Sequence, residues 1–236
     1  MSKRRAVADI DLQQGVIADE LLDMGSATLY EASGIDCYLN PTFQPAWAGA
    51  QFVGRALPVL AASGDNLALH WALALARPGD VLVVDGGDED CGYFGEVMAV
   101  AAQARGIAGV IIDGGVRDTR QLEALKFPVF STRVAIRGTN KKWAGSIGPT
   151  LTLRGRPISR GDLVVADRDG IAVLPSSRIS EVVEAARQRT AVEDAYMQRL
   201  REGELTLDVF GFRDIDEPLI TTANPILLDP GNEVAK

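Results

Sequence analysis

Two glycine-containing segments of the 236-residue chain carry closely spaced charged side chains directly after apolar runs. The first, DGGDED at residues 85–90, follows VLVV, and the second, DGGVRD at residues 113–118, follows GVII. An apolar run closed by a glycine turn predicts a buried strand, and loops at strand ends commonly carry the functional side chains of α/β proteins. A lone Asp in such a loop is also explained as a cap of a turn or helix. The adjacent pair Arg117 and Asp118 is the stronger candidate for chemistry.

A second candidate lies between these segments, in GYFGEVMAVAAQARG at residues 92–106. The pattern predicts a helix whose N-terminus holds Gly95, Glu96, Val97 and Met98. The free N–H groups of a helix N-terminus, together with the helix dipole, bind a carboxylate or a phosphate. Glu96 either suits that dipole as a structural residue or holds a metal-bound water, and the residues alone leave both interpretations open.

Apolar periodicity and the positions of Gly and Pro predict the elements that must position these side chains. We expect helices within residues 16–34, with a break near Gly25, and within 66–76, 95–106, 119–125 and 179–202. We expect strands within residues 52–62, 81–84, 109–112 and 128–136. Residues 151–175 predict three short β runs joined by the turns RGRP and DRDG, which is a β-meander.

The alternation of strands and helices favours an α/β fold, and the meander makes the sheet mixed. No repeat and no low-complexity linker divides the chain, so we expect a single domain over residues 1–236. The N-terminal helices and the C-terminal helix and tail, about residues 179–236, are expected to pack on neighbouring subunits.

The composition excludes several classes of protein. A formal net charge of −8 argues against a nucleic-acid partner. No segment approaches the roughly 20 apolar residues of a membrane span and no signal peptide is present, so we expect a cytoplasmic protein without a membrane partner. Cys37 and Cys91 lack metal-ligand spacing and are interpreted as ordinary thiols, and the single histidine, His70, disfavours a multi-histidine zinc site.

Four segments, at residues 64–87, 95–118, 127–139 and 161–175, resemble the family of 4-hydroxy-4-methyl-2-oxoglutarate aldolases, also called 4-carboxy-4-hydroxy-2-oxoadipate aldolases. The family includes the regulators of ribonuclease E activity. The resemblance covers about residues 66–175 and implies an αββα-type sandwich that assembles as a homotrimer or homohexamer. Metal-dependent members carry Arg-Asp in the second charged turn, whereas the ribonuclease regulators keep the arginine without the aspartate. Arg117 and Asp118 therefore place the chain on the enzyme side of the resemblance.

The resemblance also implies roles for particular residues. Asp118 matches the aspartate that binds a divalent ion, Mg²⁺ or Mn²⁺, and Arg117 matches the arginine that holds the pyruvyl oxygens of the substrate. Residues 95–98 match the backbone segment that receives the pyruvate carboxylate, and Glu96 matches a carboxylate that orients metal-bound water. Lys141 aligns with a lysine near the site.

The C-terminal helix supplies a further candidate by the same resemblance. Glu193 is expected to bind metal waters in the site of a neighbouring subunit, although Glu202 and Glu204 lie in the same segment. Residues 148–162 depart from many relatives, which carry a valine-rich stretch there, and this leaves substrate preference open.

The leading hypothesis is a metal-dependent carbon–carbon lyase, a class II pyruvate aldolase. It would cleave 4-hydroxy-4-methyl-2-oxoglutarate or 4-carboxy-4-hydroxy-2-oxoadipate to pyruvate and a second 2-oxo acid. A cation and an arginine at the keto oxygen would stabilise the enolate, and oxaloacetate decarboxylation, which forms the same enolate, is the expected side activity. The alternatives are another metal-dependent lyase or hydratase that acts on an oxo acid, and a non-enzymatic binding protein of the ribonuclease-regulator kind.

Overall fold

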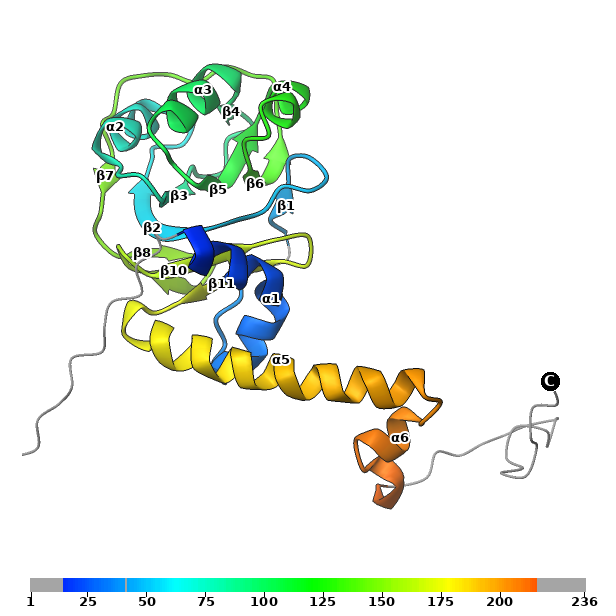
Figure 1. Ribbon diagram of the computed structural model, residues 1–236. Helices are drawn as coiled ribbons and strands as arrows, with labels where there is room; N and C mark the ends of the chain where they lie inside the picture. The colour runs from blue at the N-terminus through cyan, green and yellow to red at the C-terminus, as the bar shows by residue number, and fades with distance from the viewer. Residues whose placement is uncertain (1–14, 41, 216–236) are drawn as a thin grey trace, which may run out of the picture. The chain divides into compact units, whose positions relative to one another are not determined.

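The computed structural model describes residues 15–40 and 42–215 (Figure 1). By its internal contacts the chain divides into two compact units, residues 1–191 and 192–236, and each unit is described by itself. Across the described residues, no helix combines the length and the apolar character that crossing a bilayer requires.

The first unit is built around one mixed sheet of nine strands, in the order β1-β6-β5-β3-β2-β10-β11, with β4 paired to β5 and β7 paired to β2. The central strands are parallel, and they are β2 (Phe52–Leu60), β3 (Asp80–Asp85), β5 (Gly109–Val116) and β6 (Val129–Val134). The antiparallel additions are β1 (Gln44–Pro45), β7 (Ser146–Ile147), β10 (Leu163–Ala166) and β11 (Ile171–Leu174), while β4 (Gly92–Phe94) runs parallel to β5.

Three crossover helices connect the parallel strands and cover one face of the sheet (Figure 1). They are α2 (Leu67–Leu75), α3 (Glu96–Ala104) and α4 (Thr119–Ala124). α2 and α3 bury small and apolar residues at helical spacing, as α2 does with Ala68, Leu69, Ala72 and Leu73, whereas the short α4 buries Leu122. These helices fix the loops at the carboxyl ends of the strands, where the candidate site lies.

The strands form two β layers, one with β3, β5 and β6 and the other with β10 and β11 (Figure 1). The strands of both layers are apolar on both faces, so each layer can be covered on both sides. In β10, Val164 and Ala166 join one buried cluster while Leu163 and Val165 join another, which is the period of two expected for a strand. The first cluster lies between the layers and includes the hairpin of β8 (Leu151–Leu153) and β9 (Arg156–Ile158).

The outer cluster packs β10 and β11 against α1 (Gly15–Ser33) and the first part of α5 (Ile179–Arg201), after the 3₁₀ turn η1 (Ser176–Arg178). The layers run helix, sheet, sheet, helix, which confirms the expected αββα arrangement with a mixed sheet. α1 is broken at Gly25 (φ 81°, ψ 160°), as the sequence predicted.

The expectation of three β runs in residues 151–175 is wrong. The segment forms four strands, of which β8 and β9 make a separate two-stranded sheet while β10 and β11 join the main sheet. A turn ends β9, because Gly161 adopts φ 91° and the Asp162 carboxylate accepts hydrogen bonds from the N–H groups of Ser159 (2.8 Å) and Ser176 (2.9 Å). Residues 160–162 therefore form a turn between β9 and β10, which the sequence pattern had suggested to be one continuous β run.

The second unit contains the end of α5, α6 (Thr206–Val209) and the 3₁₀ turn η2 (Phe212–Asp214). The Phe210 ring stacks on the Phe212 ring, with centroids 5.5 Å apart, and meets the Tyr196 ring edge to face, with centroids 5.1 Å apart. The prediction of one domain whose ends pack on neighbouring subunits stays a prediction.

Asp167 holds the break in α1, and its removal is expected to destabilise the first unit. Its carboxylate accepts bonds from Ser26 N (2.6 Å), Ser26 Oγ (2.7 Å) and Asp169 N (2.9 Å). Because Asp167→Ala leaves those donors without an acceptor, we expect it to lower the free energy of unfolding by about 1–3 kcal/mol in urea titrations. Asp169→Ala, which removes an exposed carboxylate from the same turn, is the control, and equal losses in the two variants would contradict the role of Asp167.

Candidate active site at the ends of β4 and β5

The candidate site forms where β4 and β5 end side by side. Gly92 of β4 is paired with Gly115 of β5, and Arg117 N donates to the Phe94 carbonyl at 2.9 Å. Because the two strands are parallel, the residues that follow β4 and β5 leave the sheet at the same edge. This pairing brings Arg117 and Asp118 to the N-terminus of α3.

Asp118 has a backbone conformation that few side chains adopt. Its φ of 57° lies in the left-handed region, where Asp and Asn are the tolerated non-glycine residues. It occupies the N-cap position of α4, yet its carboxylate makes no capping bond to that helix. Instead Oδ2 accepts the Glu96 N–H, the first of α3, at 3.1 Å. The unusual turn directs a carboxylate to a neighbouring helix, and such conformations are often found at functional sites.

Gly95 is needed at this place for space rather than for its backbone angles, since its φ of −161° is ordinary extended backbone. A Cβ on Gly95 would lie 2.4 Å from Asp118 Oδ2 and 3.0 Å from Arg117 Cγ. A Cβ on Gly92 would lie 3.0 Å from Arg117 Cδ and 2.5 Å from the Ala135 carbonyl. The two glycines therefore form the surface on which the stem of Arg117 rests.

The guanidinium of Arg117 remains available to a ligand. Its Nε is 3.5 Å from Asp118 Oδ2, a loose contact, and its side chain is 45% exposed. A planar guanidinium can donate two parallel hydrogen bonds to a carboxylate or to neighbouring carboxylate and keto oxygens. Arg117 and the first turn of α3 together provide donors for an anionic ligand.

The first turn of α3 contains the predicted residues Glu96, Val97 and Met98 after the N-cap Gly95. Glu96 and Val97 are exposed, whereas Met98 is buried. The N–H groups in the first turn of any helix lack intrahelical acceptors, so this turn suits an anion. The predicted helix start, arginine and aspartate therefore meet at one place.

Lys141 is positioned by the start of α2. Asn140 exchanges backbone hydrogen bonds with Gly64 (2.7 Å) and Asn66 (3.1 Å), and the Asp65 carboxylate accepts Lys142 N (2.6 Å). Burial alone would raise the pKa of Asp65, but the backbone N–H groups that it accepts bring the pKa below its ordinary value. Asp65 is thus a structural carboxylate that holds the segment bearing Lys141.

Sequence reasoning missed Asn66, which links the start of α2 to the start of α3. Its Nδ2 donates to the Tyr93 carbonyl at 2.9 Å and lies 3.6 Å from Met98 Sδ. Its buried Oδ1 has no hydrogen-bond partner within the described part of the chain. Only the short strand β4, too brief to show a periodic pattern, reveals why an Asn is buried here.

The acidic loop at residues 85–90 does not join this site. Asp85 accepts the Gly87 N–H at 3.1 Å, Asp90 pairs with Arg133 at 3.1 Å, and Glu89 pairs with Arg137. The carboxylates of Asp85, Glu89 and Asp90 thus have partners within the loop or on neighbouring residues, which favours a structural role for these three.

The expected turn at Asp113 is also wrong, because β5 continues through Val116. A register shift between Ile112 and Gly115 bends the strand, and the Asp113 side chain, 13% exposed, is bound by Arg154 Nε at 2.5 Å and by its Nη2 at 2.7 Å. Asp113 fastens the β8–β9 hairpin to the sheet and is not part of the ligand site.

The residues at this place fit a divalent ion that keeps most of its water ligands. No group of three or more His, Cys, Asp or Glu side chains gathers among the described residues, so an enclosed all-protein cage is absent from this part of the chain. Mg²⁺ keeps several waters and is commonly held by one or two carboxylates. Asp118 provides one such carboxylate, and the exposed carboxylate of Glu96 lies on the neighbouring first turn of α3.

Glu193 lies in the second compact unit, and its predicted role at the metal stays a prediction. Within the same unit the Glu204 carboxylate is engaged by Arg199 Nη2 at 2.6 Å.

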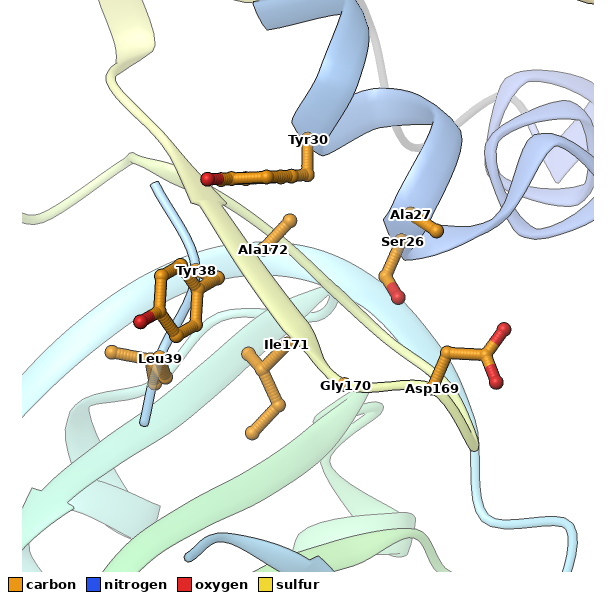
Figure 2. A pocket seen from close by; sticks show the side chains of 9 residues that line it. All are labelled: Ser26, Ala27, Tyr30, Tyr38, Leu39, Asp169, Gly170, Ile171 and Ala172. Carbon is orange, nitrogen blue, oxygen red and sulfur yellow. The ribbon is translucent and has the colours of Figure 1, made fainter. Parts of the chain in front are cut away.

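A separate hollow of about 350 Å³ lies elsewhere in the first unit, between the second half of α1 and β11 (Figure 2). It shares no residue with the site at β4 and β5.

A model of the family described as RraA-like, Aldolase/RraA, matches residues 17–173. A protein of Halalkalibacterium halodurans with the name "Putative 4-hydroxy-4-methyl-2-oxoglutarate aldolase" is 37% identical over 183 residues, which are 77% of this chain and 85% of that protein. A solved structure of an uncharacterized Pseudomonas syringae protein has a TM-score of 0.74 at 27% identity, covering 83% of this chain and 97% of that one. Streptomyces coelicolor RraAS2, described as an unusual member of the RNase ES inhibitor RraA protein family, has a TM-score of 0.67 at 27% identity over 77% and 95% of the two chains.

Gly95→Ala tests the geometry of the site. The new Cβ would lie 2.4 Å from Asp118 Oδ2, so the carboxylate must move away from α3. We expect the affinity for Mn²⁺, measured by calorimetric titration, to fall about tenfold or more, as it does when groups that orient a metal ligand are disturbed. Gly138→Ala, whose Cβ meets nothing within 4 Å, is the control. Unchanged Mn²⁺ affinity in folded Gly95→Ala would show that the position of Asp118 does not matter for the metal.

Proposed function

The chain belongs to the Aldolase/RraA family, and from that premise we propose that it is a divalent-metal-dependent carbon–carbon lyase that releases pyruvate from a 4-hydroxy-2-oxo acid. The observation that carries the proposal is the contact of Asp118 with the first N–H of α3, beside the exposed guanidinium of Arg117. It brings a metal-binding carboxylate, a cation and an anion-binding helix start together.

Substrate binding follows from the donors at this place. The Glu96 N–H is bound to Asp118, so the N–H groups of Val97 and Met98 in the first turn of α3 receive the pyruvyl carboxylate. Arg117 donates to the keto oxygen and the adjacent carboxylate oxygen. Lys141 faces the further carboxylate that such substrates carry.

Asp118 would hold Mg²⁺ or Mn²⁺, which supplies Lewis acidity at the keto oxygen. Glu96, exposed in the first turn of α3, takes the proton of the 4-hydroxyl through a water molecule. As the C3–C4 bond breaks, its electron pair forms the enolate of pyruvate while the former C4 hydroxyl becomes a carbonyl. Arg117 stabilises the enolate oxygen, and the proton held at Glu96 returns through water to C3 to give pyruvate.

Relatives named for 4-hydroxy-4-methyl-2-oxoglutarate support that compound as substrate, with 4-carboxy-4-hydroxy-2-oxoadipate as its close analogue. Oxaloacetate decarboxylation would follow as a side activity because it forms the same enolate. The likeness to RraAS2 favours one further candidate, a non-enzymatic ribonuclease regulator. A chain that releases no pyruvate from any of these acids, with Mg²⁺ or Mn²⁺ present, would support that candidate instead.

Asp118→Ala is expected to abolish metal-dependent pyruvate release, measured with lactate dehydrogenase as the coupling enzyme. Because Asp118 has φ 57°, which Asn tolerates better than Ala, Asp118→Asn is the companion variant that keeps the backbone: it should also lose activity, with a circular dichroism spectrum equal to that of the unaltered protein. Asp90→Ala is a matched control, because Asp90 lies on the acidic loop and pairs with Arg133 of β6 rather than with Arg117. Activity in Asp118→Ala equal to that of the control would remove Asp118 from the mechanism.

Glu193→Gln tests assembly. If this carboxylate enters the site of a neighbouring subunit in a homotrimer or homohexamer, the variant should lose turnover without a change of oligomer size on a sizing column. Subunits with only Asp118→Ala mixed with subunits with only Glu193→Gln should regain activity, because some interfaces then pair two intact halves.

Impaired Glu193→Gln that gains nothing on mixing, after proven subunit exchange, would place the carboxylate in its own chain. Glu184→Gln, which changes an exposed carboxylate earlier on α5, is the control variant.

A further inference from the structure

β5 contains one residue more than the neighbouring strand β6 in the stretch that leads to the candidate site. Ile112 is paired with Ser131 and Gly115 with Arg133, so three steps along β5 match two steps along β6. Such an extra residue is a β-bulge, and bulges beside functional sites commonly change the direction of the side chains that follow them. The bulge comes directly before the arginine and the aspartate of the candidate site and therefore affects which way they face.

Side-chain size alone does not fix the position of this bulge. A Cβ on Gly115 would overlap the carbonyl oxygen of Cys91, so a larger residue does not fit there without a shift of the backbone. Gly114 is also a glycine and could take the same place if the bulge were lost. Each following residue would then occupy the place of the next one, and Arg117 would stand where Asp118 now stands. The site therefore needs a contact that keeps the extra residue in β5.

Thr132, which lies opposite the bulge on β6, makes such a contact. Its Oγ1 accepts the N–H of Gly114 at 3.0 Å, which satisfies a backbone donor within the bulge. The hydroxyl has a single proton, and Asp113 Oδ1 lies 3.2 Å away as its acceptor, closer than the Gly114 carbonyl at 3.4 Å. With that proton directed to Asp113, the lone pairs of Oγ1 remain for the N–H of Gly114.

Asp113 is itself held by Arg154, from the turn between β8 and β9. The guanidinium donates to the carboxylate through Nε at 2.5 Å and through Nη2 at 2.7 Å. The side chain of Asp113 is 13% exposed, and a two-pronged ion pair fixes its direction as well as its distance. Arg154, Asp113 and Thr132 thus form a chain of contacts from the β8–β9 hairpin to the bulge.

We propose that Thr132 is a positioning residue that keeps the bulge in β5. Oriented by Asp113 and Arg154, it directs the carboxylate of Asp118 to the first N–H of α3. The buried side chain of Val116 also favours the observed register, so loss of the hydroxyl should displace the site and leave the sheet folded. The effect on metal and substrate rests on the proposed function, whereas the effect on the position of Asp118 does not.

The first test follows backbone amides by hydrogen exchange and NMR in the full, metal-free chain. Thr132→Val removes the hydroxyl and keeps a branched side chain, whereas Thr132→Ser keeps the hydroxyl. In Thr132→Val we expect the amides of Glu96 and Arg117, which donate to Asp118 and to the Phe94 carbonyl, to exchange about threefold faster or more. The amides of residues 82–84 in β3 should keep their protection, and Thr132→Ser should keep protection at every one of these positions.

Unchanged exchange of the Glu96 amide in Thr132→Val would overturn the proposal. Faster exchange of residues 82–84 to the same degree would also overturn it, because Thr132 would then serve the stability of the whole sheet. Failure of Thr132→Ser to restore the protection of Glu96 would show that the hydroxyl is not the group responsible.

The second test measures metal affinity and turnover. Thr132→Val should bind Mn²⁺ about fivefold more weakly or worse in calorimetric titration, and Thr132→Ser should bind it almost as the unaltered protein does. The kcat/KM for pyruvate release should follow the same order. Asp167→Ala, which we expect to destabilise the same unit from outside the site, is the control and should leave the Mn²⁺ affinity unchanged.

Equal Mn²⁺ affinity in Thr132→Val and the unaltered protein would overturn the link between the bulge and the site. If the unaltered chain binds no Mn²⁺ and releases no pyruvate, the proposed function fails, while the exchange of the Glu96 amide still decides the role of Thr132.

Arg154→Lys tests the outer part of the chain of contacts, because lysine cannot reproduce the two-pronged contact with Asp113. We expect the Glu96 amide to exchange about twofold faster, the same direction as in Thr132→Val. Arg160→Lys, which changes a single looser contact with Asp80 at 3.5 Å, is the matched control. If Arg154 acts through Thr132, the double variant should exchange no faster than Thr132→Val alone, and additive effects would overturn this order of contacts.

Discussion

The hydrogen bond from the first N–H of α3 to the carboxylate of Asp118 is the interaction on which the site depends. It requires a left-handed backbone at Asp118, a glycine at residue 95 to leave room for the carboxylate, and parallel pairing of β4 with β5. The left-handed backbone of Asp118 costs free energy, and neither Gly95 nor the strand pairing alone indicates a site. Together they hold a carboxylate and an arginine at the open end of a helix.

The rest of the first unit supports this contact. The continuous apolar strands β3 and β5 are buried on both faces, so the ends of the parallel strands stay in register at one edge of the sheet. The charged side chains of the neighbouring loops are neutralised locally, Asp113 by Arg154 and Glu89 by Arg137. Asp118, in contrast, directs its carboxylate to the first N–H of α3.

The sequence predicted the main helices and parallel strands because their apolar patterns are long. It indicated Arg117 and Asp118 as candidate site residues because a glycine turn does not by itself require two adjacent opposite charges. It failed where the deciding contact is distant in sequence. Asp113 belongs to the strand because it pairs with Asp85 of β3, and its largely buried carboxylate is accommodated by Arg154, 41 residues later. Asn66 is buried because its amide donates to the Tyr93 carbonyl, 27 residues away. Strands of three residues, such as β4, carry too few positions for a period of two.

The most direct test of the account is a crystal structure of the full chain grown with Mn²⁺ and pyruvate, with an anomalous difference map collected for manganese. We predict a manganese peak about 2.1 Å from a carboxylate oxygen of Asp118, with the Glu96 N–H still bound to Asp118, the pyruvate carboxylate on the N–H groups of Val97 and Met98, and Arg117 on the pyruvate keto oxygen. A manganese peak at the acidic loop of residues 85–90, with pyruvate absent from the start of α3, would contradict it.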